Sequence, residues 1–449
     1  MDDLAVKPTG PESERTTGTR PTALLPASHL LRISAYWLGL TAIDSAVNIV
    51  VQNRVNFDRS LVPDELMIGT TTALVVLAGA ILSILIQPTV GYLSDFTVSR
   101  WGRRKPFIVV GSLLDVVFLL GIAFSNTLLA LGAFLALLSV STNVARGPFQ
   151  GYVPDLVAEK QVGLASALVG MMQVVGNVAG VLLATFAVQA GSLPVALIAV
   201  AVVELVTMAS VVLRVGNGLP PRPREGRSWV RIARETWATD ILQEHSYLWL
   251  LASRFLFLTA GGILFNLAVQ YLSQVHRLPQ NEAAGAQRTM SILIVIAIVI
   301  VAVPAARLSD RFGRKPVIYV SCGIGAVAML LGALAPNLAV AYLAAVLYGI
   351  GGGIFVAVDW ALMTDIIPRA SSGRYMGLSN VATGASGPVS VAVGGIIADT
   401  VNRVAGMGVG MRVSLLVALG MYVLAAVALR PVVEPRPGRA ARREAAVSG

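Results

Sequence analysis

Apolar runs alternate with short polar segments along most of the 449-residue chain. Each run has roughly the 20 residues that an α-helix needs to cross the hydrocarbon core of a bilayer. Each run therefore predicts a transmembrane helix, and the chain as a whole predicts an all-α membrane protein. The twelve predicted helices cover residues 31–51, 66–89, 107–124, 128–145, 164–187, 194–213, 247–271, 289–306, 317–334, 338–364, 376–398 and 412–429.

Polar segments divide these helices into two groups of six. Residues 1–28 are rich in Pro, Thr and Gly and have no apolar core followed by a cleavage site, which predicts a disordered tail and no signal peptide. Residues 214–245 predict a linker between an N-terminal half at 29–213 and a C-terminal half at 246–431. The basic residues 432–449 are expected to remain unfolded.

The linker contains one amphipathic stretch. It follows the flexible sequence GNGLPPRPREGR and places Trp229, Ile232, Trp237 and Ile241 roughly on one helical face. Such a face predicts either a helix that lies on the cytoplasmic membrane surface or a soluble linker helix, and the sequence does not separate the two.

Composition supports lipid as the solvent. Hydrophobic residues make up 55% of the chain and charged residues 13%, with a mean hydropathy of +0.75, which is too apolar for a soluble chain of this length. About 27 of the 34 Lys and Arg residues fall in the tails and even-numbered loops, against about six in the odd-numbered loops. This bias predicts a multi-pass plasma-membrane protein with both termini in the cytoplasm.

Several other functions are not expected. The net charge of +10 does not indicate nucleic-acid binding, because the basic residues lie between apolar runs and not on one polar face. Cys322 is the single cysteine, and no cluster of Cys and His has metal-ligand spacing. No nucleotide or nucleophile site appears either, so neither a metal, nor a cofactor, nor enzymatic activity is expected.

One charged loop occurs twice. GYLSDFTVSRWGRRKP covers residues 91–106 after the second apolar run, and RLSDRFGRKP covers residues 307–316 after the eighth. A second match follows the fourth and tenth runs, where VPDLVAEKQVG and TDIIPRASSG each carry an Asp eight residues before a Gly. Repeats of this kind predict two pseudo-symmetric six-helix halves around a central cavity.

The residue order in these loops predicts a cytoplasmic gate. An Asp at one helix end can face the positive N-terminus of another helix while arginines pair with it, a Gly gives the turn, and a Pro starts the next helix. We expect Asp95 to contact the helix that starts near Arg374, and Asp310 the helix that starts near Leu164. The alternative is a basic cluster that only fixes topology. The predicted gate residues are Gly91, Asp95, Arg100, Gly102, Arg103, Arg104 and Asp155 in the first half and Asp310, Arg311, Gly313, Arg314 and Asp365 in the second.

These loops resemble the signature of the major facilitator superfamily of secondary transporters, most closely in DRFGRKP. The first copy has four extra residues, Phe96 to Ser99, and is similar to the longer form in the glycoside and sucrose carriers of that superfamily. The resemblance implies alternating access, in which the two halves rock around a solute bound near the midplane of the bilayer.

The likeness to sucrose carriers fails at one informative place. Residues 143–156, NVARGPFQGYVPDL, resemble their sequence, but those carriers have a protonatable Asp and an Arg where this chain has Ser139 and Gln150. Arg146 stands nearby, at a position that the family fills with a neutral residue. The related melibiose-type carriers bind sodium at carboxylates on the second span, which has none here, so sodium coupling is disfavoured.

Ionisable residues inside the predicted helices are the remaining candidates for coupling, because they are costly in lipid. Asp44 on span one and Asp359 on span ten lie on helices that line the cavity in this superfamily, so we expect a proton or substrate role for them. A structural helix-helix hydrogen bond is the alternative. Asp115 and Glu204 are expected to have structural partners or to snorkel, and Arg254 to reach the membrane interface.

Aromatic and amide side chains on the same spans are of the kind that holds a sugar by stacking and hydrogen bonding, although each could equally serve interhelical packing. The predicted proton and substrate residues are Asp44, Asn48, Asn143, Arg146, Gln150, Asn266, Gln270, Asp359 and Trp360, with Tyr36 and Trp37 as further stacking candidates and Gln52 on the face of Asp44.

The sequence thus predicts a proton-coupled carrier that moves a small polar solute, such as a sugar or glycoside, and works as a monomer in the bilayer. One alternative is a proton-driven exporter of amphipathic organic compounds. Another is a non-transporting receptor or assembly factor on the same scaffold, which the duplicated gate disfavours.

Overall fold

The structure is a computed structural model. It describes residues 23–433, except 159–160, 218–219, 222, 225, 227, 232–243 and 367–371. The predicted tails therefore lie almost entirely outside the described residues, as does the amphipathic part of the linker after residue 231.

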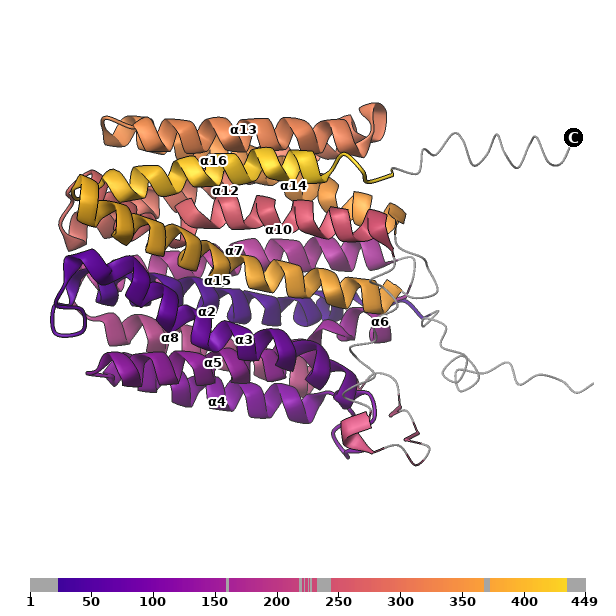
Figure 1. The fold of residues 1–449 in the computed structure, drawn as a ribbon. Coiled ribbons are helices and arrows are strands. Elements are labelled where there is room, and N and C mark those ends of the chain that lie inside the picture. Colours follow the sequence, from indigo (N-terminus) through magenta and orange to yellow (C-terminus); the bar gives the residue numbers. More distant parts are fainter. Residues whose placement is uncertain are drawn as a thin grey trace, which may run out of the picture.

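The described residues form long helices that run side by side in one bundle (Figure 1). The first half contains α2 (Ala27–Phe57), η1 (Glu65–Met67), α3 (Ile68–Ser94), α4 (Lys105–Phe124), α5 (Leu128–Gln150), α6 (Tyr152–Leu156), α7 (Val162–Gln189) and α8 (Leu193–Arg214). The second half contains α10 (His245–Asn266), α11 (Ala268–Val275), α12 (Gln280–Phe312), α13 (Arg314–Leu334), α14 (Leu338–Ile366), α15 (Ser372–Ala405) and α16 (Val409–Ala428).

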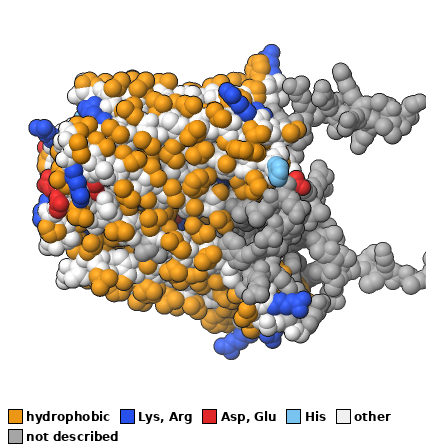
Figure 2. All heavy atoms as spheres, viewed as in Figure 1, with side chains coloured by type: hydrophobic (Ala, Val, Ile, Leu, Met, Phe, Trp, Pro, Cys, Tyr) orange, Lys and Arg blue, Asp and Glu red, His pale blue; other side chains and the backbone are white. Residues whose placement is uncertain are grey.

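Twelve helices in the described ranges are long and apolar enough to cross a membrane, which confirms the predicted fold class. Their outer faces carry exposed apolar side chains, for example Leu129 at 84% exposure and Leu213 at 76%. Figure 2 shows hydrophobic side chains covering the middle of the molecule, with charged side chains gathered at its ends. This distribution suits a surrounding hydrocarbon layer.

We name the two ends of the bundle by where the first and last helices begin and end. The terminal side is the end where α2 begins and α16 ends, on the right in Figure 1, and the distal side is the opposite end. Loop 95–104, between α3 and α4, lies on the terminal side, and loop 58–67, between α2 and α3, on the distal side.

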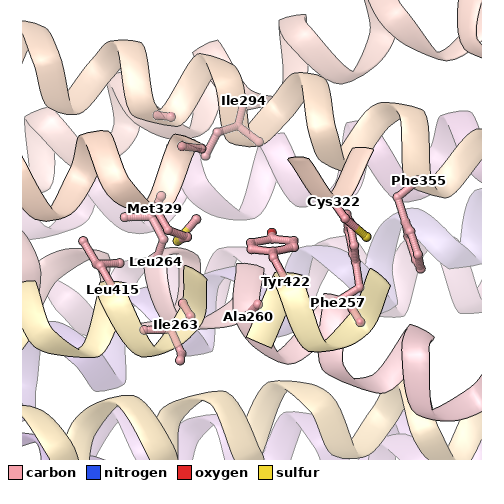
Figure 3. Close-up of a cluster of buried hydrophobic side chains, with 14 of the residues drawn as sticks. Phe257, Ala260, Ile263, Leu264, Ile294, Cys322, Met329, Phe355, Leu415 and Tyr422 are labelled. Carbon is pink, nitrogen blue, oxygen red and sulfur yellow. The ribbon is translucent and has the colours of Figure 1, made fainter. Parts of the chain in front are cut away.

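Most buried apolar residues cluster within their own half, although Ala73 of α3 belongs to the cluster of the second half. In the first half α2 packs on α7 and α8, and α3 packs on α5. In the second half, Phe257 on α10 stacks on Phe355 on α14 with ring centroids 3.8 Å apart, and Tyr422 on α16 meets Phe257 edge-on (Figure 3). The halves meet mainly where α15 packs on α3 and α12 packs on α7. The cavity described below can therefore form between two separately packed units.

The seventh transmembrane segment differs from the prediction. The sequence predicts one helix over residues 247–271, but the structure ends α10 at Asn266 and starts α11 at Ala268. Leu267 leaves helical geometry with φ −114° and ψ 20°. The freed N–H of Val269 instead donates to Gln52 Oε1 at 3.1 Å, so a partner in the other half compensates for the break.

The two halves touch closely on the distal side. Gly69 at the start of α3 and Gly395 on α15 lie backbone to backbone, and a Cβ on Gly69 would collide with the Gly395 carbonyl oxygen. Asp399 on α15 accepts hydrogen bonds from the backbone N–H groups of Gly69 at 3.0 Å and Thr70 at 2.5 Å. These contacts close the distal side of the bundle.

Candidate functional site

A cavity of about 480 Å³ lies between the halves. Helices α2, α3 and α5 line it from the first half, and α10 and α15 from the second. Its size is in the range of roughly 300–1,000 Å³ that small-molecule sites occupy. Its polar lining consists of Asp44, Asn48, Gln52, Thr72, Ser83, Gln87, Ser139, Thr142, Asn143, Arg146, Gln150, Asn266, Asn380, Thr383 and Ser386.

An ion pair stands in this lining. Asp44 Oδ2 on α2 lies 2.6 Å from an Nη atom of Arg146 on α5. The Asp44 side chain is 48% exposed and that of Arg146 20% exposed. The Asp44 carboxylate is therefore accessible from the cavity, while its negative charge is balanced by a cation at hydrogen-bonding distance.

Amide side chains form a chain across the interface at the distal end of the cavity. Gln52 donates to Asn48, Asn48 donates to Asn266 Oδ1 at 3.4 Å, and Asn266 donates to Ser390 Oγ at 3.0 Å. Asn266 is the last residue of α10, so the break at Leu267 places this amide at the cavity wall. The result is a set of neutral donors and acceptors contributed by both halves.

Two further predicted residues line the cavity closer to the terminal side. Asn143 donates to the carbonyl oxygen of Ser139, one turn earlier on α5. Gln150 Oε1 accepts from Asn380 Nδ2 of α15 at 3.4 Å. Asn380 was not among the predicted site residues. No sequence signal marks it, since its relevance comes only from the packing of α15 against the first half.

Asp359 and Arg254 form a second ion pair, in the second half, through the Arg254 guanidinium and Asp359 Oδ2. Asp359 is only 3% exposed and does not line the cavity. Arg254 also donates to Thr383 Oγ1 at 3.0 Å, and Thr383 does line it. The expectation that Arg254 reaches the membrane interface is wrong, because a buried carboxylate compensates its charge.

Other predicted solute contacts lie elsewhere. Gln270 is buried on α11 and donates to Asp399 at 3.4 Å, outside the cavity. Tyr36 is fully buried against Ser112 and Phe149, and Trp37 packs on Phe149. The side chain of Trp360 lies outside the described residues. No aromatic ring is among the described cavity-lining residues, so the stacking expected from Tyr36 and Trp37 does not occur there.

Four predicted gate residues of the first half, Asp95, Arg103, Arg104 and Asp155, form one ion-pair cluster on the terminal side. Asp155 Oδ2 accepts from Arg103 at 2.5 Å and from Arg104 Nε at 2.8 Å. Asp95 Oδ1 lies 3.1 Å from Arg104 and 3.5 Å from Arg103. Arg104 also donates to the Pro148 carbonyl at 2.7 Å, which ties the loop to α5.

Glycines and one phenol complete this cluster. Gly102 has φ +91°, which its turn requires, and Gly91 allows α3 to approach Gly147 of α5. Burial raises the pKa of Tyr152 beside Arg104 and Asp155, so its hydroxyl stays protonated. Arg100 lies outside the cluster, exposed beside Trp101.

The second copy of the loop is more open. Asp310 is 67% exposed and pairs with Arg314 at 2.5 Å, four residues later. Gly313 has φ +97° at the turn, and Arg311 lies over Phe312. The side chain of Asp365 lies outside the described residues, as does that of Arg374. The ion-pair partners given for Asp95 and Asp310 lie in their own halves, so neither predicted contact across the halves is present among the described side chains.

Comparison with known proteins agrees with this architecture. The family model described as Major Facilitator Superfamily matches residues 33–303 and 284–448. The chain belongs to this superfamily. It is a transporter of that family, and no comparison points to an enzyme.

Relatives within the superfamily match only part of the chain. A general alpha-glucoside permease of Schizosaccharomyces pombe is 38% identical over 128 residues, which cover 25% of this chain and 23% of the permease. Sucrose transport protein SUC3 of Arabidopsis thaliana is 30% identical over 128 residues, covering 23% of this chain and 21% of that protein. The match thus spans less than a quarter of either relative.

Among solved structures, a mutant of the nucleoside transporter NupG is similar over 91% of this chain and 100% of its own, with a TM-score of 0.69 and 15% identity. At that identity the likeness concerns the fold alone. This likeness in fold agrees with the two six-helix halves, which the contacts between helices define.

Proposed function

We propose that this transporter is a proton-coupled symporter of a small polar solute, such as a sugar or glycoside. The observation that carries the proposal is the Asp44–Arg146 pair, an acid with water access at the wall of a cavity that both halves build. A carboxyl group placed in this way can bind a proton and solute from the same opening.

The lining supports a neutral polar solute. Amides from both halves, Asn48, Gln150, Asn266 and Asn380, offer donors and acceptors that match hydroxyl groups. The partial likeness to an alpha-glucoside permease and a sucrose transport protein points to the same class of solute. The absence of aromatic rings among the described lining residues argues for recognition by hydrogen bonds more than by stacking.

We further propose that the terminal side faces the cytoplasm of a plasma-membrane protein that works as a single chain. The excess of Lys and Arg in the tails and even-numbered loops supports this orientation. With the distal side closed by Asp399 and the glycine contact, the structure then corresponds to a cytoplasm-facing state.

The first test separates solute binding from coupling. In Asp44→Asn the amide resembles the protonated acid, so counterflow exchange of the solute in proteoliposomes should persist. Accumulation driven by a pH gradient should be lost, because no proton is bound and released. Asp58→Asn, which removes a carboxylate outside the cavity, is the matched control. Normal gradient-driven accumulation by Asp44→Asn would exclude Asp44 as the coupling acid.

The second test concerns solute and direction. Uptake of a panel of labelled sugars and glycosides should rise when the outside of the vesicle is acidic. If no member of the panel accumulates and cells that express the protein instead resist amphipathic toxins, the exporter interpretation replaces this one.

A further inference from the structure

A second group of acids lies inside the first half, away from the cavity. Asp115 is in the middle of α4 and Glu204 in the middle of α8, and both side chains are 0% exposed. The two carboxyl groups approach each other, with Ser112 and Tyr36 beside them. Neither residue lines the cavity. Two acids thus share one region that is inaccessible to solvent in this structure.

Their hydrogen bonds leave most of the carboxyl oxygens unpaired. Asp115 Oδ1 accepts from Thr142 Oγ1 at 3.0 Å and from the Ser141 hydroxyl. Within the described part of the chain, Asp115 Oδ2 and both oxygens of Glu204 have no hydrogen-bond partner of acceptable geometry. Unpaired oxygens of this kind are very unfavourable on a buried carboxylate and much less so on a neutral carboxylic acid.

Charge balance leads to the same conclusion. The ionisable groups that face the pair are Tyr36 and Arg146, on α2 and α5, and the sequence of α7 contains no ionisable residue. Arg146 is the one facing cation among the described residues, and Asp44 on α2 already balances it at 2.6 Å. Two ionised acids would therefore stand uncompensated in the membrane interior.

We propose that Asp115 and Glu204 form a proton-binding site, separate from Asp44, and that Arg146 couples the two sites. Arg146 Nε is buried and has no hydrogen-bond partner among the described residues. Thr142, one turn earlier on α5, already binds Asp115. Arg146 therefore lies on the same face of α5 as Thr142, which contacts Asp115, and its Nε–H is a donor that the pair could use.

The coupling follows from competition for one cation. While the pair holds its protons, Arg146 stays with Asp44 and favours the ionised form of Asp44. When movement of the halves lets water reach the pair and take up a proton, the new negative charge of the pair attracts Arg146, and Asp44 can then bind a proton more readily. One carboxyl O–H bond breaks in the pair, one can form at Asp44, and Arg146 stays protonated throughout. The pair should thus extend proton uptake by Asp44 to higher pH.

The coupling rests on the proposed role of Asp44, whereas the proton site itself does not, so the test uses a readout independent of transport. Infrared spectra of the purified protein in an ester-free maltoside detergent report the carbonyl band of protonated carboxyl groups. The difference spectrum of wild type minus the double variant Asp115→Asn/Glu204→Gln should show such a band at neutral pH. The single variants Asp115→Asn and Glu204→Gln provide the same comparison if the double variant does not fold. No band difference for any of them would overturn the proton site.

The coupling is tested by repeating the pH titration of this band in Asp44→Asn. With no carboxylate at position 44, Arg146 is available to the pair, so the band should disappear at a pH lower by about one unit or more. Asp58→Asn, which removes a partly exposed carboxylate outside the cavity, should leave the titration unchanged. An unshifted band in Asp44→Asn would overturn the coupling and leave the proton site standing.

Discussion

At the scale of single residues, the two halves carry ion pairs of opposite polarity at related positions. Asp44 and Arg146 join α2 to α5, and Arg254 and Asp359 join α10 to α14. In both halves these are the first and fourth long helices, but the acid and the base have exchanged places. The pairs also differ in water access, because the Asp44 side chain is 48% exposed and that of Asp359 4%. We therefore expect the second pair to act mainly on stability.

Removing one charge of that pair should be costly. Asp359→Asn leaves the Arg254 guanidinium without its buried counter-charge and should lower stability by about 3–5 kcal/mol. Arg254→Met/Asp359→Leu removes both charges and should recover most of the loss. Thermal unfolding in detergent measures both. The exposed pair offers a control, since Asp310→Asn should change stability by less than about 1 kcal/mol. A double variant no more stable than Asp359→Asn would contradict this account.

Single positions also show which residues could be selected from the sequence and which of their partners could not. Asp44, Asn48 and Asn266 could be selected because polar groups in apolar runs are costly and face other protein groups. That Asp44 meets Arg146, or that Arg254 meets Asp359 across 105 residues, could not be predicted, since helix rotation and packing decide it. Asp399 was not selected at all, although it holds the distal contact.

At the scale of elements, α3 and α15 form an antiparallel pair that bridges the halves. Near the end of α15, Asp399 accepts from the N–H groups at the start of α3. Directly after α3, Asp95 lies on the terminal side, where α15 begins. Each helix thus carries an acid at its C-terminal end that is suited to the positive N-terminus of the other. In this structure the distal contact is made, while Asp95 is paired with Arg103 and Arg104.

Weakening the distal contact should open that side. Asp399→Asn loses charge-assisted hydrogen bonds worth roughly 1.5–3 kcal/mol, which is about tenfold or more in the population of the distal-closed state. Gly395→Ala should act in the same direction, since its Cβ would lie 2.5 Å from the Gly69 carbonyl oxygen. Spin labels at Met67 and Val404, in a Cys322→Ser background, report the separation of the two helix ends on the distal side.

The expected result is a shift of the Met67–Val404 distance distribution to longer values in both variants. Asp64→Asn, which removes only the charge of the side chain that caps η1, should leave the distribution unchanged and serves as the control. Distances that match wild type in Asp399→Asn would show that apolar packing alone closes this side.

At the scale of the whole molecule, the sequence predicted the helices and the duplicated loops, but it did not predict the contacts that join the two halves. Twelve apolar runs predicted twelve helices, and the duplicated loops predicted two related halves. The break at Leu267 could not be predicted, because its compensation comes from Gln52, 217 residues away from Val269. Contacts between the halves also decide which side of the bundle is closed. Local sequence patterns do not predict these contacts.

The last prediction concerns the terminal side. Among the described contacts, Asp95 does not meet the start of α15 in the way that Asp399 meets the start of α3. In this structure Asp95 belongs to a buried cluster with Arg103, Arg104 and Asp155, on the helix that already carries the distal contact to α15. If the halves rock, closure of the terminal side should bring the start of α15 toward Asp95. Asp95→Asn should then slow solute transport several-fold while the distal-closed state stays populated.

Transport in proteoliposomes, with the Met67–Val404 distances measured in parallel, tests this. Asp310→Asn should slow transport less, because Asp310 is 67% exposed and pairs only within its own loop among the contacts described. Both variants must insert and purify as wild type does, with Asp58→Asn as the control for loss of a surface charge. If Asp95→Asn and Asp310→Asn both transport at the wild-type rate, the loops fix topology only, and the closure of the terminal side has to be sought in α5 and α15, where Gln150 already meets Asn380.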